Sequence, residues 1–425
     1  MLVRLMLSCI LFLSCILGPL AHSSAEVESS AKESCDFLFI PHDAGESYML
    51  QPVIDLFVSN NSYSFLILTL GQPSTDIYSK NYSQHQRTLS SLGIDDVQVK
   101  DGTDEARAQL LSNSDIKVIL NSIQTSFVVT GMVYSMQSQI SNAYKEVYKS
   151  TIVGLDDSFT LWDPTSILSK EFTEPNVVDE VFFTATDIAE GMMNESSSAS
   201  IIATVTGSPT LDSWEVIASD EENINHIRNI VYSKGDADED FVGVVFAGGY
   251  TDHLASSYDA SLRIFCTTAI NLSATSSTYR FLFSPHPGYD PIAYEVPRFK
   301  KWGCDEEVIH VLSEHEGFST AEIVAASNVS LSQCSTVGGQ SLAISKPHSF
   351  ISTEDKCVDV FTEAGLIPHA FTPEILENTI TETFKVENYY VPKSDIVASG
   401  IPLLAVRKIW NRMNTILTEI TGVIS

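Results

Sequence analysis

The chain has 425 residues, of which 54 are acidic and 24 basic, so its formal net charge at pH 7 is −30. Hydrophobic residues make up 44% of it, which is typical of a folded globular protein and excludes a disordered or collagen-like one. The excess of acid argues against nucleic acid as a partner, because binding to phosphate backbones depends on Lys and Arg. At roughly 100 to 200 residues per domain, the length predicts about two or three domains, and we start from two.

The N-terminal segment has the layout of a signal peptide. A single arginine precedes the apolar stretch 5–17, and Ser23 and Ala25 have the small side chains and spacing that a signal peptidase reads. We therefore predict a cleaved signal over residues 1–25 and a location in the secretory lumen or outside the cell. The alternative is an uncleaved type II membrane anchor, because 2–21 approaches the roughly 20 apolar residues that span a bilayer.

The cysteines outside this leader are five in number and widely spaced: Cys35, Cys266, Cys304, Cys334 and Cys357. Without a CxxC pattern they predict one or two disulfides and a buried thiol, and no zinc or other metal site. N-x-[ST] sequons are compatible with a glycoprotein, but a chain rich in Ser and Thr contains several by chance.

Short apolar runs that alternate with helical patterns predict an α/β fold throughout the first half. A helical pattern over 48–57 follows the first run. The expected strands are 36–41, 63–70, 117–120, 150–155, 180–184 and 201–206. Such runs are typical of a buried parallel sheet, so we predict a Rossmann-like N-terminal domain over 26–206.

The pattern starts again after a linker and helix at 207–240. Strands are expected at 241–246, 279–284, 308–312, 329–332 and 347–351, and helices at 259–270, 320–326 and 337–345. We predict a second doubly wound domain over 241–400 and a C-terminal helix within 401–425 that packs across one or both domains. Ligands of such open sheets bind beyond the carboxyl ends of the strands, so a site is expected in a cleft between the domains.

Two motifs of the first half follow predicted strands. At His42, Asp43 and Gly45 a tight turn leads into a helix N-terminus that offers backbone NH groups to an anion; alternatively, Asp43 only caps the helix and His42 fills the turn. Asp156 and Asp157 end a later strand, where one carboxylate could serve as general base for an acceptor hydroxyl; alternatively, both cap the segment that follows.

Three motifs of the second half are candidates for holding a phosphate. His286, fixed by Pro287 and a second proline after a strand, could neutralise a leaving phosphate, or be an ordinary turn residue. Ser335 and Thr336 precede a helix rich in small residues, which places hydroxyls and free NH groups at its N-terminus. The pair Gly248 and Gly249 forms a further candidate phosphate loop. GxSxG and HExxH motifs are not in the sequence, which argues against common hydrolases.

Taken in order, these motifs resemble the two-domain GT-B glycosyltransferases, in particular bacterial sialyltransferases and polysialyltransferases and the related glycerophosphotransferases and epimerases. Those enzymes have a [DE]-[DE]-G motif in the first domain and His-Pro and Ser-[ST] motifs in the second, and Asp156-Asp157, His286-Pro287 and Ser335-Thr336 occupy these places. The resemblance implies an acceptor-side first domain and a nucleotide-binding second domain. Ser158 stands where the family has Gly, which puts the acceptor-side chemistry in question.

The resulting hypothesis is an inverting transferase that moves a sugar, sialic-acid-like among the candidates, from a nucleotide donor to an acceptor hydroxyl. Asp156 or Asp157 would be the base, His286 would stabilise the departing phosphate, and no cofactor is expected. Two alternatives stay open: a nucleotide-sugar 2-epimerase, and a secreted binding protein that keeps the fold without catalysis.

Overall fold

The computed structural model describes residues 32–60, 62–94, 107–161, 172, 176–194, 200–232, 241–247, 255–285, 293–312, 317–333, 335–352, 359–384 and 389–422. The predicted signal peptide lies outside this range. Within it, none of the helices combines the length and the apolar character that crossing a bilayer requires.

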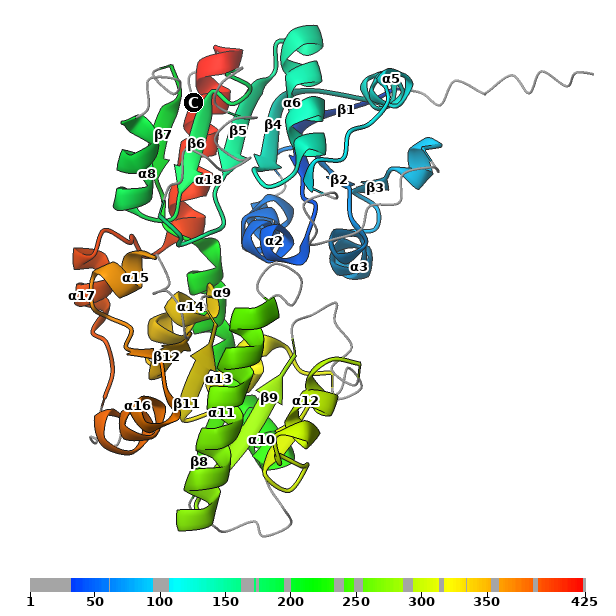
Figure 1. The fold of residues 1–425 in the computed structure, drawn as a ribbon. Helices are drawn as coiled ribbons and strands as arrows, with labels where there is room; N and C mark the ends of the chain where they lie inside the picture. The colour runs from blue at the N-terminus through cyan, green and yellow to red at the C-terminus, as the bar shows by residue number, and fades with distance from the viewer. Residues whose placement is uncertain are drawn as a thin grey trace, which may run out of the picture.

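The first half of the chain forms a sheet of seven parallel strands in the order β3-β2-β1-β4-β5-β6-β7 (Figure 1). The strands are β1 (Glu33–Ile40), β2 (Phe65–Thr69), β3 (Gln86–Thr88), β4 (Ile123–Gly131), β5 (Thr151–Leu155), β6 (Glu180–Phe183) and β7 (Ile202–Val205). Every residue of β2 is buried, as expected where helices cover both faces of a parallel sheet.

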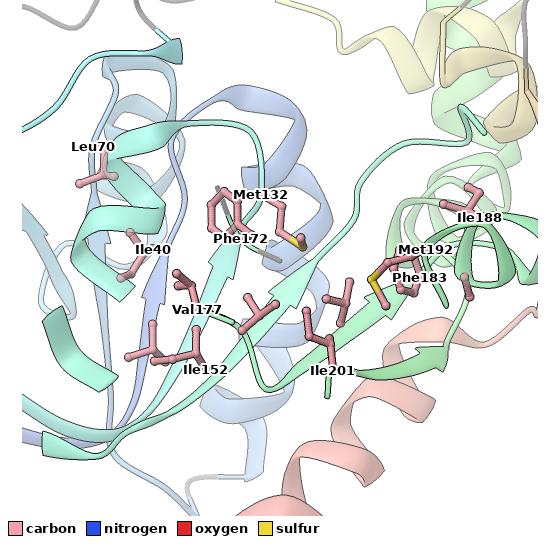
Figure 2. Close-up of a cluster of buried hydrophobic side chains, with 14 of the residues drawn as sticks. Ile40, Leu70, Met132, Ile152, Phe172, Val177, Phe183, Ile188, Met192 and Ile201 are labelled. Carbon is pink, nitrogen blue, oxygen red and sulfur yellow. The ribbon is translucent and has the colours of Figure 1, made fainter. Parts of the chain in front are cut away.

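Helices pack on both faces of this sheet, and the core lies between them. They are α2 (Ala44–Asn60), α3 (Gln72–Asn81), α5 (Asn113–Ser122), α6 (Ser135–Tyr148) and α8 (Thr186–Met193), with a short 3-10 turn, η1 (Ser90–Leu92). Alternate side chains of β1 face opposite sides of the sheet. Phe37 packs with α2 on one side, and Ile40 belongs to the core cluster on the other side, which extends across the sheet through Ile152 to Phe183 (Figure 2).

The second half forms a sheet of six parallel strands in the order β10-β9-β8-β11-β12-β13. The strands are β8 (Val242–Ala247), β9 (Tyr279–Ser284), β10 (Ile309–Val311), β11 (Val329–Ser332), β12 (His348–Ile351) and β13 (His369–Ala370). The remaining helices are α9 (Pro209–Ala218), α10 (Glu221–Tyr232), α11 (Ala255–Thr275), α12 (Glu295–Lys301), α13 (Thr320–Ala326), α14 (Val337–Ala343), α15 (Val360–Glu363), α16 (Pro373–Asn378), η4 (Thr379–Thr383), α17 (Lys393–Ala398) and α18 (Ala405–Thr421).

The C-terminal helix α18 returns from the second half to the first, where it lies beside β6 and β7 in red (Figure 1). Its apolar residues Ile409 and Met413 join the core around Phe37. Arg412 makes a two-pronged ion pair with Glu180 of β6, with nitrogen–oxygen distances of 2.8 and 2.7 Å. The predicted C-terminal helix therefore packs on the first domain.

Two connections between the domains meet where α9 and α18 begin. Gly207 has a φ of +87°, and a Cβ at this position would overlap the carbonyl oxygen of Pro402. The carboxylate of Asp212 accepts hydrogen bonds from the backbone NH of Leu404 at 3.1 Å and of Val406 at 2.9 Å, so an α9 side chain caps α18. The hydrogen bonds of Asp212 therefore fix the orientation of α9 relative to α18.

The predicted α/β fold with two doubly wound sheets and a C-terminal helix is confirmed, but the strand expected at 117–120 is wrong. That segment lies in α5, because Ser112 and Asp115 form a capping box and Ile119 and Leu120 are buried on one face of the helix. The central strand β4 that follows, which pairs with both β1 and β5, was not predicted, although its buried and exposed residues alternate at the start.

The cysteines agree with the expectation of a disulfide and a buried thiol in the described part of the chain. Cys266 of α11 is bonded to Cys304, and Cys35 is buried and free. Cys334 and Cys357 lie outside the described residues.

Replacing Gly207 by Ala is expected to lower the free energy of unfolding by about 3 kcal/mol, because the new Cβ adds a backbone clash to the cost of a left-handed conformation. Gly93→Ala is the matched control: it has a φ of +81° and open space around the position, so it should cost only about 1 kcal/mol. Urea unfolding of both variants measures the difference. Equal losses would show that the contact with Pro402 does not constrain the connection.

Candidate functional site

A cavity of about 1000 Å³ lies between the two domains. The first-domain wall comes mainly from α2, which packs beside α9 (Figure 1). The second-domain wall comes from the carboxyl ends of β8, β9 and β10 and from the starts of α13 and α14. This is the place where ligands bind in open parallel sheets.

The two walls of the cavity differ in charge. The strand ends of the second sheet and the starts of α13 and α14 bring no charged side chain to the lining among the described residues, and they are rich in hydroxyls: Ser284, Ser319, Thr320, Ser335 and Thr336. Asp212 of α9 also lines the cavity, but its carboxylate accepts hydrogen bonds from the backbone at the start of α18. On the opposite side the lining includes Asp55 and Asp157. A bound anion is therefore favoured at the hydroxyl-rich second-domain wall. At the first-domain wall the carboxylates of Asp55 and Asp157 repel it.

The acidic wall begins at the first turn of α2, where the sequence places two acidic residues in positions that suit a helix N-terminus. Asp43 caps the helix: its Oδ1 accepts from the backbone NH of Glu46 at 3.0 Å, and its carbonyl accepts from the Ser47 hydroxyl at 2.6 Å. Because an acid in the first turn interacts favourably with the helix dipole, this placement of Asp43 stabilises α2.

Glu46 is buried beneath this turn and ties it to the sheet. Its Oε2 accepts hydrogen bonds from the backbone NH of His42 and from Nε2 of Gln137 on α6, both at 2.8 Å. The carboxyl group packs against Gly131, where a Cβ would overlap Oε1. Oε1 is buried and has no hydrogen-bond partner among the described residues.

Asp157 brings a third carboxyl group to the same point. It follows β5, whose register is continued by a bond from the NH of Asp156 to the carbonyl of Phe182 at 3.1 Å. A Cβ built on Gly45 would lie 3.1 Å from Oδ2 of Asp157 and 3.4 Å from Oδ1 of Asp43. The carboxyl groups of Asp43, Glu46 and Asp157, which we call the carboxyl cluster, thus converge around the N-terminus of α2.

Burial of the carboxyl cluster disfavours its charged forms. Burial, with the charges of Asp43 and Asp156, raises the pKa of Asp157 to about 8. Burial and the neighbouring charges of Asp43 and Asp157 also raise the pKa of Glu46 well above its ordinary value. Burial raises the pKa of Asp43, while the guanidinium of Arg107 acts in the opposite direction on both Asp43 and Asp157.

His42 is fully buried and does not line the cavity. Its ring stacks on Tyr134 with a centroid distance of 3.4 Å, and burial lowers its pKa to about 3, so it is neutral. For the motif His42, Asp43 and Gly45 the sequence allowed either an anion site or a capping Asp43 with a His42 that fills the turn. The second of these describes the observed geometry of Asp43 and His42. Gly45 of the same motif does line the cavity.

Of the acidic pair, Asp157 lines the cavity and Asp156 does not. Oδ1 of Asp156 accepts from the NH of Ser158 at 3.3 Å, a local turn contact, and burial raises its pKa to about 7. The structure therefore distinguishes between the two carboxylates that the sequence left equivalent, and Asp157 is the one that a ligand could contact.

The predicted phosphate-binding residues have different outcomes. Ser335 and Thr336 line the cavity at the start of α14, where the NH of Gly338 bonds to the Ser335 carbonyl at 2.9 Å. Gly248, Gly249, His286 and Pro287 lie outside the described residues. Nearby residues of the same loops, Ala247, Ser284 and Pro285, do line the cavity. The phosphate-binding roles of the six predicted residues stay predictions.

Sequence reasoning missed several residues of the site. Glu46 could have been found, because an acid three residues after a capping Asp is a common helix start. Tyr48 and Asp55 of α2 could have been found from their spacing with Gly45, which places them on one helix face. Nothing in the acidic segment around Arg107 marks that residue.

Asp157→Asn is expected to make stability less dependent on pH. The unfolded pKa of an aspartate is about 3.9, so with a folded pKa of about 8 the native state binds more protons, and stability falls as pH rises from 5 to 9. At about 1.4 kcal/mol per pH unit between pH 5 and the folded pKa, the asparagine variant should lose up to about 4 kcal/mol less than the wild type over this range. Urea unfolding at pH 5, 7 and 9 measures it.

Asp76→Asn, an exposed aspartate of α3 outside the carboxyl cluster, is the control and should follow the wild type. A pH dependence of Asp157→Asn that equals that of the wild type would contradict the assignment of a buried, protonated Asp157.

No known protein family and no curated protein matches the sequence. Solved structures do match over nearly the whole chain. The Staphylococcus aureus protein MnaA in complex with UDP superposes with a TM-score of 0.65 at 13% identity, covering 92% of this chain and 99% of the other. The UDP-GlcNAc 2-epimerase of Neisseria meningitidis bound to UDP-GlcNAc gives 0.62 at 12% identity, covering 91% and 100%.

The wall teichoic acid polymerase TagF in its H444N variant superposes less closely, with a TM-score of 0.54 at 13% identity over 93% of this chain and 92% of the other. At such identities the likeness concerns the fold. The resemblance drawn from the sequence is confirmed at that level: the chain has the two-domain GT-B fold, with the epimerases and the polymerase as its structural relatives.

Proposed function

We propose that the protein is an enzyme that binds a nucleotide-activated sugar in the cavity between its domains and transfers the sugar to an acceptor hydroxyl, with Asp157 as the proton acceptor. The observation that carries this proposal is the contrast between the two walls: an uncharged, hydroxyl-rich wall at the strand ends of the second sheet faces a wall that carries Asp157. The first suits phosphate groups and the second suits proton transfer.

We assign the donor to the second-domain wall because its strand ends and the starts of α13 and α14 bring no carboxylate to the lining among the described residues. The hydroxyls of Ser335 and Thr336 would bind the phosphates, and His286, by its position in the sequence after β9, would stabilise the leaving phosphate. The GT-B proteins of similar fold that were solved with UDP or UDP-GlcNAc support a nucleotide or nucleotide sugar as the ligand class.

The chemical step follows from the raised pKa of Asp157. A general base works best when its pKa lies near the working pH, and a value of about 8 satisfies this. The carboxylate takes the proton of the acceptor hydroxyl while the acceptor oxygen bonds to the anomeric carbon of the sugar. The bond from that carbon to the phosphate oxygen breaks, and the phosphate leaves with the electron pair.

The size of the cavity supports a reaction with two substrates. Pockets for one drug-sized ligand have volumes of about 300 to 1,000 Å³. At about 1000 Å³ this cavity is at the upper end, which leaves room for an acceptor beside the donor. A donor alone would leave Asp157 in contact with water, which would favour hydrolysis over transfer.

A nucleotide-sugar 2-epimerase is the second candidate, and the carboxyl cluster favours it. Epimerisation removes a proton from one face of the sugar and returns one to the other, so it requires an acid and a base close together. Asp157 lines the cavity and would be one of these groups, while Asp43 and Glu46 converge with it behind the lining and also have raised pKa values.

We also propose an oxidising location, as expected for the secretory pathway or the cell exterior. The Cys266–Cys304 disulfide supports it, because such bonds persist mainly in those compartments.

Thr336→Tyr is expected to abolish nucleotide binding, because a large side chain would fill the cavity beside α14. The measurement is the thermal stability of the purified protein with UDP, CMP and the corresponding nucleotide sugars, which should raise the melting temperature of the wild type. Thr415→Tyr on the exposed face of α18 is the control and should keep the shift. A wild type that no nucleotide stabilises would favour the non-catalytic binding protein.

Asp157→Asn is expected to lower turnover of the bound nucleotide sugar at least 100-fold, within the usual range for loss of a general base, with nucleotide binding retained. Analysis of the products separates the two candidates: an epimerised nucleotide sugar shows the epimerase, and a released nucleoside phosphate with a glycosylated acceptor shows the transferase. Turnover equal to that of Asp76→Asn would remove Asp157 from the mechanism.

A further inference from the structure

We propose that the cavity contains a binding site for an uncharged carbohydrate acceptor along helix α2, in which Tyr48 provides the stacking surface and Asp55 accepts hydrogen bonds from sugar hydroxyls. This proposal rests on the proposed function and names the acceptor class of the same cavity.

The site is one face of a single helix. Gly45, Tyr48, Pro52 and Asp55 all line the cavity, and their spacing of three and four residues places them in one stripe that starts at the carboxyl cluster. From Gly45 to Asp55 the helix rises ten residues, or roughly 15 Å, which is about the length of a few sugar rings. An acceptor along this stripe would have one end at Asp157.

Tyr48 is the exposed aromatic residue of the stripe. Its side chain is 48% exposed although it lines an interdomain cavity, and its neighbours on the helix, Met49 and Leu50, are buried in the core. An aromatic ring left open beside an acidic group provides a flat apolar surface, on which the apolar face of a sugar ring can pack while its hydroxyls remain bonded elsewhere.

Asp55 is held in place for hydrogen bonding. The hydroxyl of Tyr82, at the end of α3, donates to Oδ1 of Asp55, which fixes the carboxylate while the residue remains exposed. A carboxylate has about four acceptor positions, so this bond leaves most of them for a ligand. Asp212, the other acidic lining residue, is already occupied by the backbone NH groups at the start of α18.

Charge selects against other acceptors. The described lining residues include Asp55 and Asp157 but neither Lys nor Arg, so an acceptor that carries carboxylate, sulfate or phosphate would be repelled along α2. A cationic acceptor would be attracted by both carboxylates. We commit to the uncharged class because the stripe offers the exposed ring of Tyr48 and the remaining acceptor positions of Asp55, which suit a sugar ring and its hydroxyls.

The test is binding of the full-length mature protein, saturated with UDP, to an array of immobilised glycans that includes neutral, amine-bearing, sialylated and sulfated oligosaccharides. Neutral glycans should bind, and Tyr48→Ala should weaken that binding at least tenfold. Tyr390→Ala removes a tyrosine of similar exposure, 55%, that is not a lining residue, and should have no effect.

Two further variants separate charge from shape. Asp55→Asn keeps the contact with Tyr82 and should weaken binding of neutral glycans modestly, whereas Asp55→Lys should allow sialylated or sulfated glycans to bind. Binding of charged glycans only, binding of none, or equal binding by Tyr48→Ala and Tyr390→Ala would overturn the proposal.

The proposed function is tested by different readouts, namely the thermal shift with nucleotides and the dependence of turnover on Asp157. A protein that passes both but shows no effect of Tyr48→Ala retains the proposed function and loses only the acceptor site. A protein that shows neither the thermal shift with nucleotides nor the dependence of turnover on Asp157 contradicts the proposed function itself.

Discussion

The placement of three carboxyl groups at the start of α2 is the constraint on which the site depends. In a chain with a net charge of −30, burying acidic side chains together is costly unless they are protonated or hydrogen-bonded. Glu46 meets this requirement through His42 and Gln137, which joins the helix to β1 and α6. The same bonds fix the first turn of α2 against Gly131, and this turn forms both part of the cavity wall and the surroundings of the Asp157 carboxyl group.

The second requirement is that the two walls of the cavity keep their relative position. Each wall belongs to a different sheet, and α9 and α18 connect them. Asp212 on α9 caps α18, and Arg412 on α18 binds Glu180 in the first sheet, so a short chain of contacts runs from the cavity lining to the opposite side of the first domain. Gly207 and Pro402, where the two connections touch, lie at this junction, and the halves also meet where Phe159 packs on Phe361.

Much of the fold could be predicted because buried parallel strands read as short apolar runs, as in the segments that form β2, β5 and β9. The error at 117–120 arose because an apolar run of four residues does not separate a strand from one face of a helix, and the capping box at Ser112 decides the outcome. Asp157, Ser335 and Thr336 were predicted because they follow strands and so lie at the carboxyl ends of the strands, Asp157 in the first sheet and the two hydroxyl residues in the second. Arg107 could not be placed, since its effect on Asp43 and Asp157 depends on distances between segments far apart in sequence. For Glu46 the sequence indicates the place in the first helical turn but not the burial.

The acidity of the chain and its proposed phosphate-bearing ligand appear to conflict, and the distribution of charge resolves the conflict. Net charge acts over a Debye length of about 8 Å in physiological salt, so the groups that line the cavity dominate the potential that a ligand meets there. On the second-domain wall the described lining is uncharged and provides hydroxyls, which can bind phosphate oxygens without a cationic side chain. The opposite wall carries Asp55 and Asp157. The proposed nucleotide sugar would therefore meet less repulsion with its phosphates on the second-domain wall, away from α2, and with its sugar toward Asp157.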